Sequence, residues 1–584
     1  MTTLRLDLIG RYLRPHRLTV ITGAITLVVV NLLGVAIPLK VRTVIDELQD
    51  GFAFSYVLHQ ALTIVILATV MGSMRLWSRM LVFRVGRQVE SELRQKLFEH
   101  MLLQDVTWVQ RLGIGEIISR ATSDVENIRR LLGFALLSLT NTILAYSLTL
   151  PAMLAIDPGL SLTAVALYPL MLVAVRLFGG RMMKQQKFQQ EALASLSELI
   201  QEDLSGIGAI KIYGQEPIEK EAFGQKNRNY RNAALNLVRT RSTLFPLLEG
   251  ISSISLLFLL LLGSGQLESQ RLTIGGLVAL ILYVERLVFP TALLGFTVNT
   301  FQIGQVSLER VEELLEHQPL IRSPANPTVI TSSLEYGWIE ARGLTIRYDG
   351  AKYDTLKNLR FKLAPGELVA VVGPVGCGKT TLARAFGRMV NVPEGQLFYD
   401  GTDITYLELG ALRERLSLVP QEGYLFTASL ANNLRYGNPN ANAEDIEAAA
   451  YSARLIDDIK GFPDGFDTLV GERGLTLSGG QRQRTTLARA LLVETPLLVL
   501  DDALASVDNT TAAAILKSLK KQQGRTILMI SHQLSAAAVC DRILVMEDGQ
   551  VVQEGTHSTL VEKQGTYRRL WERQQVEERI KSIS

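Results

Sequence analysis

One short glycine-rich stretch, from Gly373 to Thr380, sets the strongest limit on the fold of this chain. An apolar run precedes it at 368–372 and a helical pattern follows it, which is the context of a phosphate-binding loop. Glycines let backbone N–H groups point inward, and the helix N-terminus adds partial positive charge. We therefore predict that Lys379 reaches the β- and γ-phosphates of a nucleotide and that the Thr380 hydroxyl binds Mg²⁺. The predicted nucleotide-binding residues here are Gly373, Pro374, Val375, Gly376, Cys377, Gly378, Lys379, Thr380 and Thr381.

The amino-acid composition indicates more than one kind of domain in this chain. A length of 584 residues favours several domains, and 47% of the residues are hydrophobic while 20% are charged. The apolar excess is concentrated in the first half. The formal net charge of only +3, without a basic stripe interleaved with aromatic residues, disfavours nucleic acid as a partner. The two cysteines, Cys377 and Cys540, allow no disulfide framework or metal-ligand spacing, and we interpret both as small semi-polar residues.

Six apolar segments in the first half are suited to cross a hydrocarbon core of about 30 Å as helices. They lie at 18–39, 57–74, 131–156, 159–175, 242–265 and 274–301. The segments 76–130 and 176–241 are long and rich in Lys and Arg, whereas Asp157 and Pro158 join the third and fourth spans without a basic residue. The positive-inside rule then places both termini and both long segments in the cytoplasm. We predict a multi-pass protein of a bacterial inner or plasma membrane.

The two long segments carry charges but also apolar residues at helical spacing, as in Val89, Leu93 and Leu97. Helices of this kind are too polar for lipid, so we expect them to extend the spans into the cytoplasm as coupling elements.

A few polar residues interrupt the apolar spans. Ionisable groups at membrane depth cost a few kcal/mol unless they are paired or face water. Three interpretations stay open for Glu285 and Arg286: each lines a cavity as a functional residue, pairs with a neighbouring helix, or lies near the membrane interface. The candidates for a substrate cavity are Asn141, Glu249, Glu285 and Asn299, which would suit lipids, hydrophobic drugs or peptides equally.

A proline-containing segment without periodicity follows the sixth span, and we interpret it as a linker. After it, short Val/Ile/Leu strands alternate with helical patterns, which is typical of an α/β domain. The predicted organisation is a transmembrane domain at 1–320, a linker at 321–335 and a nucleotide-binding domain at 336–584, which ends in a charged helix at 567–583.

Two further patterns belong to the predicted nucleotide site. Asp501 ends a buried-strand run at 496–501, where Mg²⁺ bound beside a phosphate loop needs a carboxylate. Ser478, Gly479, Gly480 and Gln481 open a helix and form a second anion site from a hydroxyl, free backbone N–H groups and the helix dipole. One nucleotide does not need two such sites from one chain, but two chains that share nucleotides do.

With these motifs in place, the second half resembles the nucleotide-binding domain of the ABC transporters. The loop at 373–380 resembles the Walker A motif, 477–481 the signature, and Asp501 the Walker B aspartate. The resemblance implies that Tyr348 stacks on adenine, that Gln421 and His532 act as the Q-loop and switch residues in catalysis, with Gln421 also at the metal, and that Asp508 lies in the D-loop.

The first half resembles the six-span domain of the exporter class in this family. Gly115–Arg120 with Asp124, and Ile210–Glu216, are similar to the cytoplasmic loops that press on the nucleotide-binding domains. The implied fold is an all-α six-span transmembrane domain followed by an α/β P-loop ATPase domain of the ABC type. The resemblance also implies a half-transporter that uses ATP and Mg²⁺ and needs a second half, with ATP between the Walker A loop of one chain and the signature of the other.

One position departs from the family pattern. Asp502 follows the Walker B aspartate where the family has a glutamate that orients the attacking water. Aspartate is one methylene shorter, and a misplacement of about 1 Å can cost on the order of 10²-fold in rate. We therefore expect a weakly hydrolytic site on this chain and a heterodimer whose partner supplies the competent glutamate. The alternative is a homodimer in which Asp502 is catalytic through a shifted water.

A rival of another class is an ATP-gated channel or a regulatory subunit, in which the site at Asp502 binds nucleotide and seldom hydrolyses it. The six spans disfavour a soluble motor ATPase. The fusion of both domains in one chain disfavours an importer. We expect ATP-driven export or flipping of an amphipathic or hydrophobic substrate.

Overall fold

The structure is a computed structural model of the whole chain, and it describes residues 6–48, 53–329, 337–471, 474, 476–505, 507, 509–520 and 524–583. Two compact units make up the chain. The first comprises Met1–Leu103 and Leu112–His317, and the second comprises Gln104–Arg111 and Gln318–Ser584. The short segment before Leu112 thus groups with the second unit although it lies within the sequence of the first.

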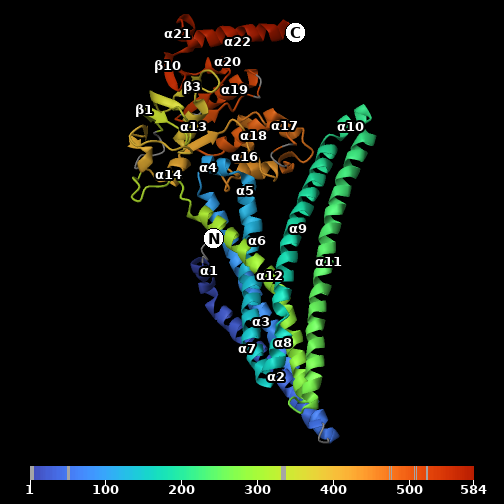
Figure 1. Cartoon of the computed structure of the whole chain (residues 1–584). Helices are drawn as coiled ribbons and strands as arrows, with labels where there is room; N and C mark the ends of the chain where they lie inside the picture. The colour runs from blue at the N-terminus through green and yellow to red at the C-terminus, as the bar shows by residue number, and fades with distance from the viewer. Residues whose placement is uncertain are drawn as a thin grey trace. The chain divides into compact units, whose positions relative to one another are not determined.

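Six helical stretches are long and apolar enough to cross a membrane, which confirms the six predicted spans (Figure 1). They are Asp7–Leu48, Phe54–Leu102, Ile114–Ile156, Pro158–Ser205, Glu216–Glu268 and Ile274–Glu316. The apolar segments occupy only part of each stretch, because the helices continue through charged sequence. The stretch Glu216–Glu268 has 53 residues and is about 80 Å long, more than twice the hydrocarbon thickness.

The helices of this part of the chain are α1 (Leu6–Leu13), α2 (Arg17–Leu48), α3 (Phe54–Leu102), α4 (Val106–Leu112), α5 (Ile114–Ser119), α6 (Val125–Arg130), α7 (Leu136–Ile156), α8 (Pro158–Val165), α9 (Tyr168–Ser205), α10 (Ile207–Tyr213), α11 (Glu216–Glu268) and α12 (Ile274–Glu316). A 3₁₀ turn, Arg14–His16, joins α1 to α2. Two π-helical turns, Arg120–Asp124 and Leu131–Ala135, interrupt the third stretch.

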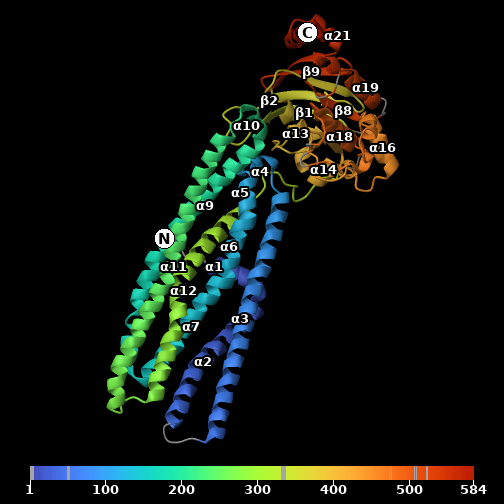
Figure 2. The ribbon, with the colours of Figure 1, turned by 90° about the vertical axis from the view of Figure 1, so that its right-hand side faces the viewer.

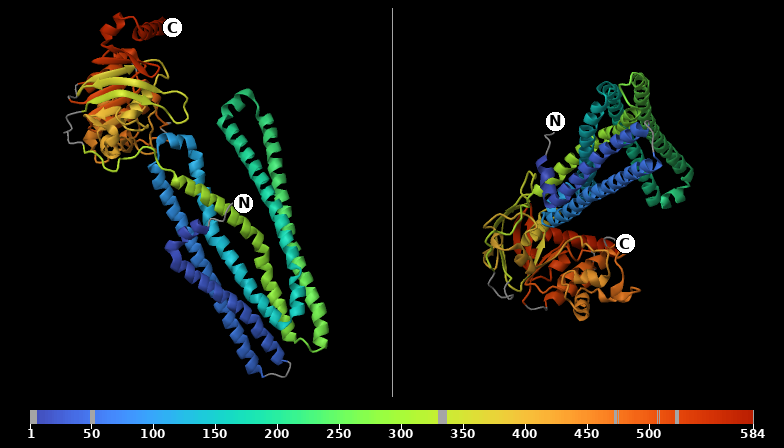
Figure 3. Two further views of the ribbon diagram at one scale, coloured as in Figure 1. Left: turned by 60° about the vertical axis from the view of Figure 1, so that its left-hand side comes forward. Right: turned by 90° about the horizontal axis from the view of Figure 1, so that it is seen from below.

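Helix pairs organise the first unit. The helix α2 packs beside α3, and α9 packs beside α11 (Figure 2). The pair α9 and α11 runs away from the other helices of this unit toward α10 (Figure 3). The helix α12 packs against α2, α7, α9 and α11 and carries fully buried side chains such as Tyr283 and Leu287. It is therefore the helix that joins the two pairs.

An ion network joins α12 to the π-helical turn. The buried carboxylate of Asp124 accepts a hydrogen bond from the Ser307 hydroxyl at 2.8 Å and pairs with Arg310 at 3.1 Å. Arg310 also pairs with Glu116 at 2.8 Å. Residues of the predicted cytoplasmic loop thus contact the cytoplasmic end of α12, and π turns of this kind occur frequently at functional sites.

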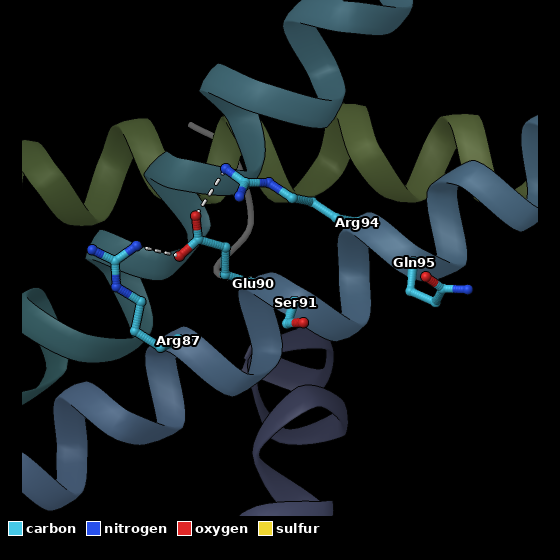
Figure 4. A pocket seen from close by; sticks show the side chains of 5 residues that line it. All are labelled: Arg87, Glu90, Ser91, Arg94 and Gln95. Carbon is cyan, nitrogen blue, oxygen red and sulfur yellow. Dashed lines mark hydrogen bonds and ion pairs between the residues drawn. The ribbon is translucent and has the colours of Figure 1, made fainter.

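A second network lies in the extension of α3 (Figure 4). The carboxylate of Glu90 is buried and pairs with Arg87 at 3.0 Å and with Arg94 at 2.9 Å, beside a cavity of about 350 Å³. Arg129 of α6 adds a third pair at 3.3 Å. The network ties α3 to α6.

The second unit contains two sheets. A six-stranded sheet has the order β10-β9-β3-β8-β7-β6, with parallel pairs throughout except for the antiparallel edge strand β10. A four-stranded antiparallel sheet has the order β2-β1-β4-β5. The strands are β1 (Ile339–Ile346), β2 (Leu356–Leu363), β3 (Leu368–Val372), β4 (Leu397–Tyr399), β5 (Thr402–Asp403), β6 (Leu416–Val419), β7 (Leu497–Asp501), β8 (Thr526–Ile530), β9 (Arg542–Glu547) and β10 (Gln550–Gly555).

Helices cover the faces of the larger sheet, because its central strands are apolar on both faces: every residue of β3, β7 and β8 is buried. The helices are α13 (Lys379–Phe386), α14 (Leu409–Glu414), α15 (Leu430–Arg435), α16 (Ala443–Ser452), α17 (Ile456–Lys460), α18 (Gly479–Leu491), α19 (Asn509–Lys520), α20 (Leu534–Ala537), α21 (His557–Glu562) and α22 (Thr566–Ile583). This confirms the α/β prediction. The domain boundaries at 320 and 336 stay predictions, and residues 330–336 lie outside the described part.

The segment 104–111 is held in the second unit by direct contacts. The buried carboxylate of Asp105 accepts the backbone N–H groups of Leu320 and Ile321, at 2.8 and 3.3 Å. Arg111 pairs with Asp349 at 3.7 Å. The sequence places this segment between the second and third spans, and only these long-range contacts reveal its association with residues after 318.

Candidate nucleotide-binding site

The glycine-rich loop joins β3 to α13, as predicted. Gly373, Gly376 and Gly378 have φ values of 154°, 83° and 100°. A Cβ at Gly373 would lie 2.1 Å from the Met546 carbonyl oxygen, and one at Gly378 would lie 2.8 Å from that of Thr355. Backbone conformation therefore favours glycine at all three positions, and close packing also requires it at Gly373 and Gly378. Gly378 is also the N-cap of α13 and provides no side-chain cap, so the first N–H groups of the helix remain available to an anion.

Lys379 lies across the loop. Its ammonium group donates to the carbonyl oxygens of Gly373 and Pro374 at 2.9 and 2.8 Å, and the residue is 5% exposed. The Cys377 sulfur lies 3.7 Å from the same nitrogen. Burial raises the pKa of the Cys377 thiol, although Lys379 opposes this shift, so the thiol stays protonated. Both cysteines are free and buried, which agrees with their interpretation as small semi-polar residues.

Two oxygen-bearing side chains meet beside the loop. The Thr380 hydroxyl donates to a carboxylate oxygen of Asp501 at 3.3 Å. Asp501 is buried at the end of β7, and burial raises its pKa while the hydrogen bond from Thr380 lowers it. The structure thus brings together two of the three residues that the sequence analysis assigned to Mg²⁺, Thr380 and Asp501. Both supply the hard oxygen atoms that this ion prefers.

Asp502 occupies a left-handed conformation with φ of 49°, which aspartate tolerates better than most residues. Its backbone N–H donates to the Ile530 carbonyl at 3.0 Å. Its side chain is buried and accepts the backbone N–H of His532 at 3.4 Å. The Asp502 carboxylate therefore contacts the loop after β8.

The exposed His532 ring lies near charged groups of the site. Desolvation and the Lys379 ammonium lower the pKa of His532, whereas Asp502 raises it. The net shift of the pKa is downward, so the imidazole is neutral at pH 7, and its ring can donate one hydrogen bond and accept another.

Three other residues were predicted to belong to the site: Tyr348, Gln421 and Asp508. The half-buried Tyr348 packs against the core, and its hydroxyl lies 3.2 Å from that of Thr381. Gln421 is exposed in the loop after β6, and the described contacts do not join it to Asp501 or Thr380. Asp508 lies outside the described residues.

The predicted second anion site is the N-terminus of α18. The Ser478 hydroxyl accepts the Gln481 backbone N–H at 3.2 Å, and the Gln481 side chain accepts the Ser478 N–H at 2.9 Å, which forms a capping box. Ser478 and Gly479 are exposed. Apart from the N–H of Gln481, the first N–H groups of the helix keep their capacity to bind an anion.

Sequence reasoning missed the residue that anchors this helix. Asp458 of α17 accepts hydrogen bonds from Gln481 at 3.1 Å and from Arg484 at 2.7 Å. A tandem Asp457-Asp458 pair gave no indication of which carboxylate faces α18. The sequence contains no local signal for this contact, because Asp458 lies 23 residues before Gln481.

The polar residues of the spans separate into two groups. Arg286 donates to the carbonyl and side-chain oxygens of Asn31, at 3.1 and 3.0 Å, and Asn31 donates to Asn141 at 3.1 Å. Arg286 thus has a partner on a neighbouring helix, which is one of the predicted alternatives. Glu249 and Glu285 are exposed, and Asn299 contacts the Met183 sulfur at 3.4 Å.

Comparisons with known proteins cover both units. Residues 20–291 match the family of the ABC transporter transmembrane region, and residues 356–505 match the ABC transporter family. The chain is 31% identical to the multidrug resistance-like ATP-binding protein MdlA of Escherichia coli, over 95% of this chain and 94% of that protein. It is 29% identical to an ATP-dependent lipid A-core flippase of Syntrophus aciditrophicus, over 99% and 96% of the two chains. A bacterial Atm1-family ABC exporter with ATP bound has a similar structure, with a TM-score of 0.77, 25% identity and coverage of 95% of this chain and 99% of that one.

Proposed function

Because this chain belongs to the ABC transporters and joins their membrane and ATP-binding regions in one polypeptide, we propose that it is one half of a dimeric exporter with a weakly hydrolytic site of its own. The chain is a multi-pass inner-membrane protein with a cytoplasmic ATPase domain, and its activity is ATP hydrolysis coupled to export. The proposal rests on two features found together in a chain with six membrane-spanning stretches. One is the phosphate loop before α13, and the other is the exposed, capped N-terminus of α18.

The phosphate loop would hold ATP on this chain. Lys379 would exchange its contacts with the Gly373 and Pro374 carbonyls for phosphate oxygens, since an ammonium group gains more from an anion than from neutral acceptors. The uncapped N-terminus of α13 would add its N–H groups, and Tyr348 would stack on the adenine.

The residues present fit a magnesium ion. Thr380 and Asp501 provide a hydroxyl and a carboxylate 3.3 Å apart. The described residues contain no group of three or more His, Cys, Asp or Glu side chains that could hold a metal, which suits an ion bound largely by phosphate and water. When bound, Mg²⁺ supplies charge neutralisation to the phosphates, and Gln421 would reach it from its exposed loop.

A second half would complete the ATP site. Ser478 and Gly479 are exposed, which suits an N-terminus that contacts a nucleotide held on another chain. The tip of the α9–α11 pair is apolar and exposed as well, with Ile212 80% and Tyr213 73% accessible. Large apolar side chains at a cytoplasmic helix tip are expected to be covered by protein, so both features support an obligate partner.

The weak hydrolysis is argued from Asp502. Its side chain is short, buried and hydrogen bonded to the His532 backbone, so it is poorly placed to orient a water beside the γ-phosphate. A glutamate would extend one methylene further. We infer that a partner chain supplies the competent glutamate, which makes the assembly a heterodimer.

The decisive experiment is Mg-ATP turnover of the chain purified alone in lipid, with native mass spectrometry to count subunits and Asp502→Glu as the matched variant. We expect the wild type to be nearly inactive and Asp502→Glu to raise turnover of any dimer it forms by up to about 10²-fold. A stable homodimer with high turnover that Asp502→Glu barely changes would contradict the heterodimer and make Asp502 the catalytic carboxylate.

A regulatory or channel role is the second candidate, and the same buried Asp502 favours it. Ionic current that tracks nucleotide occupancy in a bilayer would support it. Substrate-stimulated ATP turnover by the assembled complex would support the exporter instead.

The substrate class follows from the relatives alone. Their names refer to multidrug resistance and to lipid A-core flipping. We infer an amphipathic or hydrophobic cargo, which transport assays in vesicles with a lipid and a cationic drug would test directly.

A further inference from the structure

An arginine-lined cavity lies on α3, beyond the most apolar part of this helix (Figure 4). The cavity has a volume of about 350 Å³, and its lining residues are Arg87, Glu90, Ser91, Arg94 and Gln95. The guanidinium groups of Arg87 and Arg94 approach the carboxylate of Glu90 from two sides. The cavity is separate from the nucleotide site and from the residues predicted to line a substrate cavity.

The charges at this cavity do not balance. The side chain of Glu90 is 6% exposed and pairs with both Arg87 and Arg94. Arg129, the third partner of Glu90, is also paired with Glu126 at 3.0 Å. Arg87 and Arg94 therefore share one carboxylate, which leaves an excess of positive charge at the cavity.

Both guanidinium groups keep N–H groups that can bind an anion. Arg87 donates to Glu90 through Nη1 at 3.0 Å. Arg94 uses Nη2 for Glu90 at 2.9 Å and Nε for the Ala121 carbonyl oxygen at 3.3 Å. Among the described residues, Nη2 of Arg87 and Nη1 of Arg94 have no partner, and the two side chains are 67% and 50% exposed. Guanidinium groups of this kind bind phosphate through charge-assisted hydrogen bonds.

The contacts between α3 and α2 place the cavity at the cytoplasmic edge of the membrane. The Ser78 hydroxyl donates to the Gly23 carbonyl oxygen at 3.0 Å, and Nε2 of His16 lies 3.3 Å from the Glu92 carboxylate. These two contacts show that the helices are antiparallel here. The apolar segment of α2 begins at Leu18, between His16 and Gly23. The part of α3 between Ser78 and Glu92 therefore passes from the hydrocarbon to the cytoplasmic surface, which is the level of the phospholipid headgroups.

An apolar stripe leads along α3 toward the cavity. It consists of Leu76, Met80 and Phe83, which are exposed and follow one another at helical spacing. Arg87 comes four residues after Phe83, so it lies on the same face of the helix. An anion bound at Arg87 would have exposed apolar side chains beside it on the membrane side. A lipid would gain from this apolar surface, whereas a free phosphate would not.

We propose that the cavity binds the phosphate headgroup of an anionic phospholipid from the cytoplasmic leaflet, as a site separate from the transported molecule. Arg87 and Arg94 would bind the phosphate oxygens, and the acyl chains would pack on the apolar stripe. A net negative headgroup would offset the positive charge that Glu90 alone does not balance. A zwitterionic lipid suits the cavity less, because its choline group would bring a further cation to it. The proposal does not depend on the export function.

The test places the full chain, with the subunits that co-purify with it, in phosphatidylcholine nanodiscs without nucleotide. Trp77 is exposed beside the apolar stripe, so its fluorescence reports a nearby acyl chain. Phosphatidylglycerol and phosphatidylcholine with the same brominated acyl chains are compared, because bromine quenches the tryptophan that it contacts. The difference between the wild type and Trp77→Phe isolates the signal of Trp77 from the other tryptophans.

We expect brominated phosphatidylglycerol to quench Trp77 at a mole fraction about tenfold lower than brominated phosphatidylcholine. Arg87→Gln and Arg94→Gln should each reduce this preference about fivefold, because each removes one cation near the membrane surface. Arg87→Lys keeps the charge and should retain part of the preference. The matched control is Arg181→Gln, which changes an exposed arginine of α9 just beyond the predicted fourth span and should behave as the wild type.

Equal quenching by the two lipids in the wild type would overturn the proposal, and so would an equal loss of preference in Arg181→Gln. Quenching by neither lipid would show that another protein chain covers the apolar stripe, which also contradicts a lipid site. Soluble glycerol phosphate that displaces phosphatidylglycerol at a similar concentration would assign the cavity to free phosphates instead.

The two glutamine variants should assemble, because each leaves Glu90 two arginine partners. Size-exclusion chromatography checks this. If one variant fails to assemble, the other decides, and the lipid preference of the wild type tests the proposal without any substitution. A lack of ATP turnover would contradict the export function but would leave the quenching measurement unaffected.

Discussion

The phosphate loop before α13 and the signature helix α18 both place glycines at a helix N-terminus. They differ in whether a side chain of the same chain caps that N-terminus. The helix α13 has a glycine N-cap without a side-chain cap, and the buried Lys379 covers its loop. The helix α18 is capped by Ser478 and Gln481, and its end is exposed. The N-terminus of α13 can therefore bind an anion within its own domain. The N-terminus of α18 already has a side-chain cap and is exposed on the surface of the domain. The comparison suggests one site that holds a nucleotide and one that completes a nucleotide held elsewhere.

The largest effect should come from the outward-facing site. Ser478→Arg places a bulky side chain where the other chain's nucleotide would approach and removes the cap of α18. We expect the turnover of the assembled complex to fall at least about 100-fold, which corresponds to about 2.7 kcal/mol of activation free energy. The measurement is Mg-ATP hydrolysis in lipid.

The matched control for this change is Asn442→Arg. Asn442 is the exposed N-cap of α16 and also forms a capping box, but it lies outside the predicted site. A similar loss of turnover in this control would mean that the Ser478→Arg effect comes only from loss of a helix cap. It would contradict the proposal that α18 contacts a nucleotide held on another chain.

A smaller effect is expected at the phosphate loop. Lys379→Ala removes the ammonium group that would bind the β- and γ-phosphates, and a charge-assisted hydrogen bond is worth about 1.5–3 kcal/mol. We expect ATP binding at this chain's site to weaken about tenfold or more, as measured with a fluorescent ATP analogue. The exposed Lys517→Ala on α19 is the control.

Turnover of the complex should fall less in Lys379→Ala than in Ser478→Arg if this chain's own site hydrolyses weakly, as we propose. Equal and mild losses in the two variants would contradict the asymmetric arrangement of sites.

The anchor of the signature helix gives a stability test. Asp458→Ala removes the acceptor for Gln481 and Arg484 and leaves both donors unpaired at a partly buried site, which costs about 1–3 kcal/mol. We expect the Tm of the full chain in detergent to fall by a few degrees. The neighbouring Asp457→Ala removes an exposed carboxylate and should leave the Tm unchanged; an equal fall would show that Asp458 does not anchor α18.

The smallest effect concerns pH. His532 has a lowered pKa in the folded chain, so the unfolded chain binds the proton first as the pH falls through its ordinary value of 6.5. The contribution of this residue to stability is present above pH 6.5 and is lost below it. His532→Gln should therefore reduce the loss of thermal stability between pH 7 and pH 5.5 slightly. An unchanged or steeper pH dependence in the variant would contradict the downward shift.

Much of the architecture was predictable, because its signals are local. Six apolar stretches of sufficient length directly predict membrane-spanning helices, since the hydrocarbon thickness sets the number of residues needed. The phosphate loop needs glycines at positions with left-handed or crowded backbone, so Gly373 and Gly378 identify it from adjacent residues alone. The capping box of Ser478 and Gln481 is likewise a pattern of four consecutive residues. The roles of the site residues, the magnesium ion and the heterodimer stay predictions.

Contacts between distant residues could not be read in the same way. The sequence identified Arg286 as a charge in a span, but its placement on Gly34 and Asn31 depends on how α2 packs against α12. The grouping of Asp105 with Leu320, more than 200 residues away, depends on the route of the whole chain.

The motifs of this protein, its two-part composition and its six spans are therefore contained in short windows of sequence, where backbone conformation and hydrophobic length decide the outcome. The orientation of Asp502 toward the His532 backbone was decided by the register of parallel strands β7 and β8, which places Asp501 opposite Ile530. The same holds for the hydrogen bonds from Arg286 to Asn31. Such features depend on which surfaces meet, and close packing in three dimensions rather than local propensity selects them.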